Sequence, residues 1–157
     1  MPDDTTLPRA FQRAPVATDA HFFKLRVPLL DQGRMDTEVT RAKGMTARVK
    51  VYASGGENEL HAHMGQDHMF IVLQGSVRFY DKDGGTRDLG THEGVMLPSG
   101  TYYWFHATST EPLVLLRVDN ATKDGDDRLN IDGQPMPGNS KENKFIPPVV
   151  REGAFFE

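Results

Sequence analysis

Three histidines fall within a short stretch near the middle of the chain, at His61, His63 and His68. His61 and His63 are two residues apart, so on a β-strand their side chains point to the same face. The turn-like sequence 64–67 separates them from His68, which opens an apolar run, so the chain can double back and bring the third imidazole near the first two. Zinc, iron, nickel, copper and manganese all accept imidazole nitrogen, and three such ligands leave positions open for water or substrate. The spacing predicts a three-histidine metal site; the alternative is a solvated loop cluster.

The composition excludes several other kinds of site and partner. The 157-residue chain has no cysteine, which excludes a disulfide framework, a Cys-ligated metal or iron–sulfur site and a thiol nucleophile. Its 18 Lys+Arg against 22 Asp+Glu give a formal net charge of −4, without a long cationic run, so we expect no nucleic-acid or membrane partner. The first twenty residues hold no continuous apolar run. We therefore expect no signal peptide or membrane span, and a cytoplasmic protein.

Short runs rich in β-branched and aromatic residues alternate with turn sequences in the middle of the chain. The runs are 47–52, 69–73, 76–80, 95–97, 102–107 and 113–118. Strands of this length at regular spacing predict an all-β sandwich or barrel. No window long enough for a helix keeps a period of 3.6 without an interrupting Gly or Pro.

Both ends of the chain are rich in proline or glycine and are predicted to be extended arms. They still carry apolar side chains, among them Phe22, Phe23, Phe155 and Phe156, which is more than a disordered linker usually has. We expect the arms to lie against the barrel or against a second subunit, the alternative being loose termini.

Residues 55–107 resemble the cupin family. The first cupin motif, G-x5-H-x-H-x(3,4)-E-x6-G, is matched in every spacing by Gly55, His61, His63, His68 and Gly75, with His68 where the family usually has Glu. The second motif, G-x5-P-x-G-x2-H-x3-N, is matched more loosely. It keeps Pro98 and Gly100 but has His92, Tyr103 and Ala107 in place of its first Gly, its His and its Asn.

The resemblance implies a cupin double-stranded β-helix, or jelly-roll barrel, with extended N- and C-terminal arms. We expect residues 1–157 to form a single domain, with the barrel at about residues 40–119 and the arms at 1–39 and 120–157. It also implies one divalent metal ion inside the barrel. Cupin barrels usually associate in pairs, so a homodimer is expected.

Carried onto this sequence, the resemblance keeps His61 and His63 as metal ligands and puts His68 in the position of the glutamate. Tyr103 takes the position of the last histidine ligand. Because a phenol has a pKa near 10, we expect Tyr103 to face the metal as a catalytic proton donor or oxyanion stabiliser. The alternative is His106 as the fourth ligand, although strand alternation points it away from the face of Tyr103. His21 and His92 are expected to be structural.

Other residues are expected around the metal. Phe70 and Phe105 would line a largely apolar pocket with Tyr103, and Gln66 and Asp67 would reach a histidine ring N–H.

A metal centre without a carboxylate ligand keeps its full 2+ charge and favours anionic, bidentate oxygen ligands. We therefore expect a metal-dependent enzyme acting on a small enolate, diketone, keto-acid or phenolic substrate. The first expectation is a dioxygenase. The alternatives are a redox-neutral isomerase, cyclase or lyase, and a non-catalytic metal- or ligand-binding module. Fe²⁺ or Zn²⁺ is the expected ion, with Ni²⁺ or Mn²⁺ as alternatives.

Overall fold

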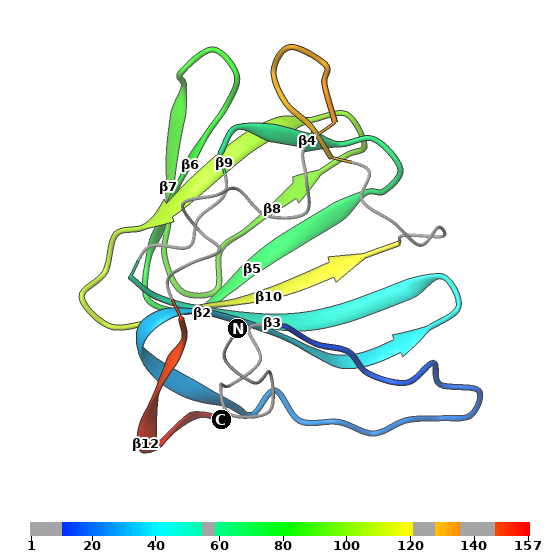
Figure 1. Ribbon diagram of the computed structural model, residues 1–157, viewed down its shortest axis with the longest axis vertical. Coiled ribbons are helices and arrows are strands. Elements are labelled where there is room, and N and C mark those ends of the chain that lie inside the picture. Colours follow the sequence, from blue (N-terminus) through cyan, green and yellow to red (C-terminus); the bar gives the residue numbers. More distant parts are fainter. Residues whose placement is uncertain (1–10, 55–58, 121–127, 136–146) are drawn as a thin grey trace, which may run out of the picture.

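The computed structural model describes residues 11–54, 59–120, 128–135 and 147–157, and in these residues it contains strands and turns but no helix (Figure 1). No helix in these ranges is therefore long and apolar enough to span a membrane. The prediction of an all-β protein is confirmed.

The larger sheet has seven strands: six pair in the order β1–β2–β3–β10–β5–β8, and β12 pairs with β2. These strands are β1 (Phe11–Gln12), β2 (Val27–Ala42), β3 (Met45–Ser54), β5 (His68–Gln74), β8 (Gly94–Leu97), β10 (Leu113–Asp119) and β12 (Val149–Phe156). All of the pairings are antiparallel except that of β1 with β2.

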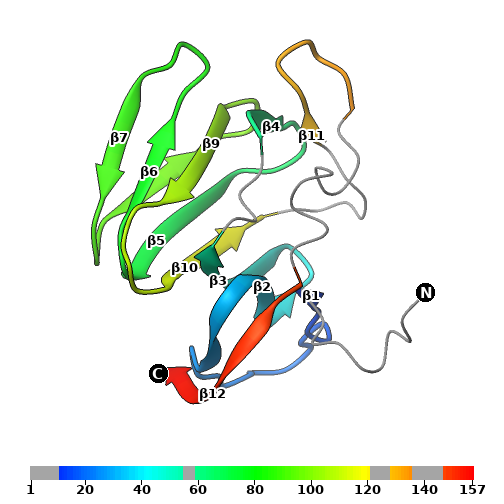
Figure 2. The same cartoon turned by 60° about the vertical axis from the view of Figure 1, so that its left-hand side comes forward.

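The smaller sheet has five strands in the order β11–β4–β9–β6–β7. They are β4 (His61–His63), β6 (Val77–Tyr80), β7 (Thr86–Leu89), β9 (Tyr102–Ala107) and β11 (Arg128–Leu129). This sheet faces the β5 and β10 part of the larger one, and the chain crosses from one sheet to the other between β4 and β5 (Figure 2). That crossing places His68 opposite the strand that carries the other two histidines.

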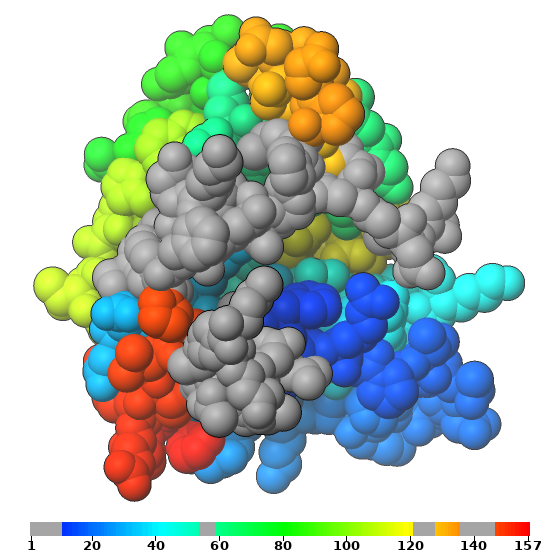
Figure 3. Space-filling view, in the orientation of Figure 1, coloured from blue at the N-terminus to red at the C-terminus, as the bar shows by residue number. Residues whose placement is uncertain are grey.

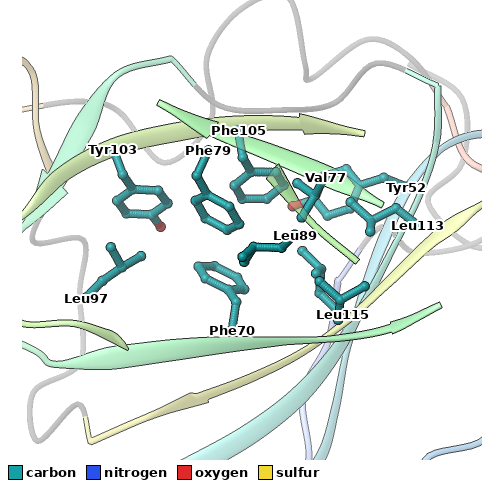
Figure 4. Close-up of a cluster of buried hydrophobic side chains, with 11 residues drawn as sticks. Tyr52, Phe70, Val77, Phe79, Leu89, Leu97, Tyr103, Phe105, Leu113 and Leu115 are labelled. Carbon is teal, nitrogen blue, oxygen red and sulfur yellow. The ribbon is translucent and has the colours of Figure 1, made fainter. Parts of the chain in front are cut away.

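The main core lies between the two sheets, because alternate residues of each strand point inward. Phe70 of β5 meets Phe79 and Phe105 of the opposite sheet, with ring centroids 5.8 and 5.5 Å away (Figure 4). The buried cluster consists of Tyr52, Phe70, Val72, Val77, Phe79, Leu89, Leu97, Tyr103, Phe105, Leu113 and Leu115.

A second core lies on the outer face of the larger sheet. It contains Val27, Leu30, Met35, Val49, Val51 and Val114, and Phe156 of β12 packs against it. Both faces of the strands β3 and β10 are therefore buried, which explains the unbroken apolar run Leu113–Leu115 in β10.

The six predicted runs all fall on observed strands, but β1, β2, β7, β11 and β12 were not predicted. β2 is a 16-residue strand within the region expected to be an arm. Its residues Arg34, Asp36 and Glu38 pair in register with Tyr52, Lys50 and Arg48 of β3, so polar side chains occupy alternate positions where the pattern predicts apolar ones. β7 was missed because it is an edge strand whose first three residues are exposed.

The expectation that the arms lie against the barrel holds for part of them. β1 and β12 pair with β2, and Phe156 is packed on the second core. Phe22 and Phe23, in contrast, are 92% and 49% exposed, so these two side chains do not pack against the barrel, and the alternative of a second subunit stays open for them. Gly55 and segments 121–127 and 136–146 lie outside the described residues.

Candidate functional site

The fold brings the three histidines of the first motif together at one end of the main core. His61 and His63 lie on β4, and His68 is the first residue of β5. The ring centroids of His61 and His63 are 5.1 Å apart, and those of His63 and His68 are 4.7 Å apart. The third imidazole thus lies near the first two, as the turn-like sequence 64–67 predicts, and all three side chains are buried.

Tyr103 joins this cluster from β9. β9 pairs with β4 so that Tyr103 lies opposite His61, with ring centroids 4.6 Å apart. The Tyr103 hydroxyl is hydrogen-bonded to Nε2 of His68 at 3.0 Å. In the core cluster, Tyr103 lies at the end away from Tyr52 and Leu113 (Figure 4). The phenol is therefore the boundary between the aromatic core and the imidazoles.

His61 is held in the tautomer that a metal ligand needs. Its Nδ1 donates a hydrogen bond to the backbone carbonyl of Glu59 at 2.6 Å, so the proton is on Nδ1 and the lone pair on Nε2. Nε2 is buried and has no hydrogen-bond partner in the part of the chain that the structure describes. A buried acceptor without a partner costs free energy that a bound cation would recover.

His63 is held by Gln66, as expected, but with the roles reversed. The Gln66 side-chain oxygen accepts a hydrogen bond from Arg117 at 3.3 Å, which leaves its amide N–H to donate to Nδ1 of His63 at 2.9 Å. The same expectation is wrong for Asp67. The Asp67 carboxylate accepts from the backbone N–H of Ser99 at 2.8 Å and from the side chain of Asn120 at 3.2 Å.

Burial keeps all three imidazoles neutral. Burial is the main cause and the positive charges of Arg117 and Lys50 add to it: together they lower the pKa of His61 to about 4 and the pKa values of His63 and His68 well below the usual range. Neutral imidazole is the form that binds metal ions.

Imidazole nitrogens are suitable ligands for a divalent metal ion, but the three rings are not oriented toward one common point. No three His, Asp or Glu side chains within the described residues are arranged to hold a metal ion. Nδ1 of His63 and Nε2 of His68 are engaged with Gln66 and Tyr103 instead. For all three rings to bind one ion, the Gln66 amide has to turn. Its oxygen then accepts a hydrogen bond from Nδ1 of His63, and the lone pair on Nε2 of His63 can bind the metal.

The remaining histidines lie elsewhere. His106 is on the opposite face of β9 from Tyr103, with its ring stacked on Tyr80 at 5.4 Å, as strand alternation predicts. His92 occupies a turn with φ of 72°, and His21 is exposed and hydrogen-bonded to Thr40. None of the three replaces Tyr103 in the cluster.

Residues 48–119 match the family model of the cupin domain. This segment is a cupin domain. Among solved structures, the chain is similar to the cupin domain of Schizosaccharomyces pombe Cnp3, with 18% identity, a TM-score of 0.52, and coverage of 59% of this chain and 67% of that one. It is also similar to KdgF from Halomonas sp., with 17% identity, a TM-score of 0.53, and coverage of 59% and 82%.

A Klebsiella pneumoniae protein with a double-stranded β-helix domain is similar at 16% identity and a TM-score of 0.53, with coverage of 59% of this chain and 81% of that one. At these identities the likeness concerns the fold alone. No curated protein matches the sequence.

A cavity of about 370 Å³ reaches this end of the cupin barrel. His68 and Asp119 line it, together with Met45, Met69 and Met96. Met69 and Met96 alternate along their strands with the core residues Phe70 and Leu97, so this space lies on the outer face of the larger sheet and borders β5 where His68 begins it.

The sequence analysis missed a set of charged side chains inside the cupin barrel. The residues of β10 that point inward are Leu113, Leu115, Arg117 and Asp119. The last two are charged, and both are buried. Lys50 of β3 is buried beside them. A signal for them exists in the sequence, because the period of two that starts at Leu113 continues onto Arg117 and Asp119.

Proposed function

We propose that His61, His63 and His68 bind one divalent metal ion per chain, and that this cupin is an enzyme acting on a small oxygen-bearing substrate. The observation that carries the proposal is the meeting of three buried, neutral imidazoles from both sheets, with the Nε2 lone pair of His61 unpartnered. Fe²⁺ or Zn²⁺ suits this all-nitrogen donor set, with Ni²⁺ or Mn²⁺ as alternatives. When bound, such an ion acts as a Lewis acid that polarises a substrate oxygen.

The chain's own residues would bind and orient the substrate and move a proton. Tyr103 carries a buried hydroxyl next to the ring of His68, where it can donate a proton to a substrate oxygen or take one up. Phe70 and Phe105 exclude water behind it. This arrangement suits an enolate, diketone, keto-acid or phenolic substrate.

Two reaction classes follow from the identity of the ion. With Fe²⁺ we propose a dioxygenase, because such substrates can be oxidised by O₂ at an iron site. With Zn²⁺ or Ni²⁺ we propose an isomerase, cyclase or lyase, in which proton transfer by Tyr103 is the main catalytic contribution of the side chains.

A non-catalytic ligand-binding module is the second candidate. It is favoured by the hydrogen bonds that already engage Nδ1 of His63 and Nε2 of His68. In such a protein these bonds would be the permanent state of the site.

Elemental analysis of protein purified without an affinity tag tests the metal site. We expect about one metal ion per chain in the unmodified protein, and far less in His61→Ala, because His61 offers the free Nε2. The control is His106→Ala, which removes a histidine from the opposite face of β9 and should keep the metal. Equal metal content in His61→Ala and the unmodified protein would contradict the proposal.

The identity of the ion and oxygen consumption then separate the reaction classes. The Fe²⁺ form should consume oxygen with a member of a panel of diketones, gentisate-like phenols and α-keto acids. If no substrate in the panel is oxidised, the dioxygenase assignment fails and the redox-neutral one takes its place.

A further inference from the structure

The inner wall of the larger sheet carries a chain of buried charges across the strands β2, β3 and β10. Asp36 forms ion pairs with Lys50 at 3.2 Å and with Arg48 at 3.5 Å. Asp119 forms ion pairs with Arg48 at 3.5 Å and with Arg117 at 3.8 Å. Three cations therefore share two carboxylates.

The uncompensated charge is concentrated at Arg117. Its distance of 3.8 Å to Asp119 is too long for a hydrogen bond, and its Nε is buried without a hydrogen-bond partner among the described residues. The guanidinium has five N–H donors, and the hydrogen bond recorded for it is the one to Gln66 at 3.3 Å. Burying a cation that is paired this weakly is costly unless an anion completes its partners.

Lys50 shows the same excess of positive charge. Burial, together with the charges of Arg117, Arg34 and Arg48 and against the opposing effect of Asp36, lowers the pKa of its ammonium group to about 7. Burial is the main cause of this low pKa and the neighbouring cations add to it, so an anion bound nearby would stabilise the charged form of Lys50.

Arg117 adjoins the histidine cluster. Gln66 joins the two, since it accepts from Arg117 and donates to His63. The guanidinium carbon of Arg117 lies 5.9 Å from the centroid of the Phe70 ring, on the inner face of the barrel.

We infer that Arg117, supported by Lys50, binds a carboxylate group of the substrate beside the histidine cluster. This inference rests on the proposed function for the place of the reaction, and it narrows the substrate to a small organic acid, such as a keto acid or a phenolic acid. A guanidinium binds a carboxylate through two parallel hydrogen bonds. One excess cation matches the single negative charge of a carboxylate better than the double charge of a phosphate ester.

The test compares acids with their neutral amides in metal-free protein. Calorimetric titrations at pH 6.5, after treatment with a chelator, would use salicylate against salicylamide and 2-oxobutyrate against 2-oxobutyramide. We expect each acid to bind at least about tenfold more tightly than its amide, as for a charge-assisted hydrogen-bonded pair. Arg117→Gln should abolish this preference and leave amide binding unchanged.

Arg78→Gln is the matched control, because it removes an arginine from a solvent-exposed ion pair with Asp88 and should keep the preference. If Arg117→Gln does not fold, Lys50→Gln takes its place, with an expected loss of severalfold in acid binding. The comparison of acid with amide in the unmodified protein needs no variant.

Equal binding of acid and amide, binding of neither acid, or equal weakening of both by Arg117→Gln would overturn the inference. These outcomes are independent of metal content. A protein that holds metal without preferring acids refutes the carboxylate site alone, and one that prefers acids without holding metal refutes the metal site alone.

Discussion

Tyr103 is the residue whose role depends most on its own chemistry, because it occupies a position where the second cupin motif has a histidine. If the phenol acts through its proton and is not a permanent ligand, Tyr103→Phe should keep about one metal ion per chain. The variant should lose about 1 kcal/mol of stability in urea unfolding, since the buried hydrogen bond to His68 is lost. Turnover of any substrate found should fall.

Tyr102→Phe is the control for this prediction. It removes a hydroxyl from the neighbouring position of β9, where Tyr102 donates to the backbone carbonyl of Asn130 at 2.9 Å. Its loss of stability should be similar, and its turnover unchanged. A Tyr103→Phe protein that loses its metal would show that the phenol is a ligand, and one with full turnover would remove the phenol from the mechanism.

Residues of the site could be predicted to meet when they are close in sequence, and could not when they are far apart. The meeting of His61, His63 and His68 could be predicted, because all three fall within eight consecutive residues. The position of Tyr103 came from the motif resemblance. The place of Arg117 beside Gln66 could not be predicted, since the two are 51 residues apart in sequence and meet only through the pairing of β10 with β5.

Some turns between strands have a backbone conformation and surroundings that few residue types fit. Gly75, between β5 and β6, is the clearest case. Its φ is +83°, and a Cβ at this position would lie 2.6 Å from Oγ of Ser109 and 3.3 Å from Cα of Leu113. Gly75→Ala should therefore destabilise the protein by roughly 1–3 kcal/mol in urea unfolding.

Gly44→Ala provides the comparison, because a Cβ there meets nothing within 4 Å. It should change the stability by less than about 0.5 kcal/mol. Equal stability of the two variants would mean that the β5–β6 turn relaxes at no cost, and that the last glycine of the first motif is not required by the fold.

Strands could be predicted where one face carries apolar side chains. They were missed where charged side chains occupy that face. The runs that became β3, β5 and β10 carry enough Val, Leu and Phe to be recognised. β2 alternates charged residues onto the inner wall, where the ion pairs of Asp36 stabilise what would otherwise be a solvated pattern. Such a strand becomes recognisable only when its partner strand is known.

At the scale of the whole molecule, the C-terminal strand closes one end of the structure. β12 pairs with β2, and Arg26 forms an ion pair with Glu157 at 3.0 Å while its guanidinium carbon lies 3.6 Å from the Phe155 ring centroid. The first and last described strands, β1 and β12, therefore both flank β2, away from the hairpin after β11 (Figures 1 and 3). The N-terminal arm beside this end leaves Val16, Phe22 and Phe23 exposed.

Exposed apolar side chains on one arm favour association of two copies, and we propose a homodimer through this arm. Light scattering coupled to gel filtration should give about twice the chain mass of 17.5 kDa. Phe22→Ser combined with Phe23→Ser should shift the protein toward monomer, because it removes the apolar surface that would be buried between the arms. Ile131→Ser is the control, since Ile131 is 51% exposed in the hairpin after β11, at the other end of the molecule, and its loss should leave the dimer intact. An unmodified protein that is monomeric at micromolar concentration would contradict the proposal, and dissociation by Ile131→Ser alone would move the interface to the opposite end.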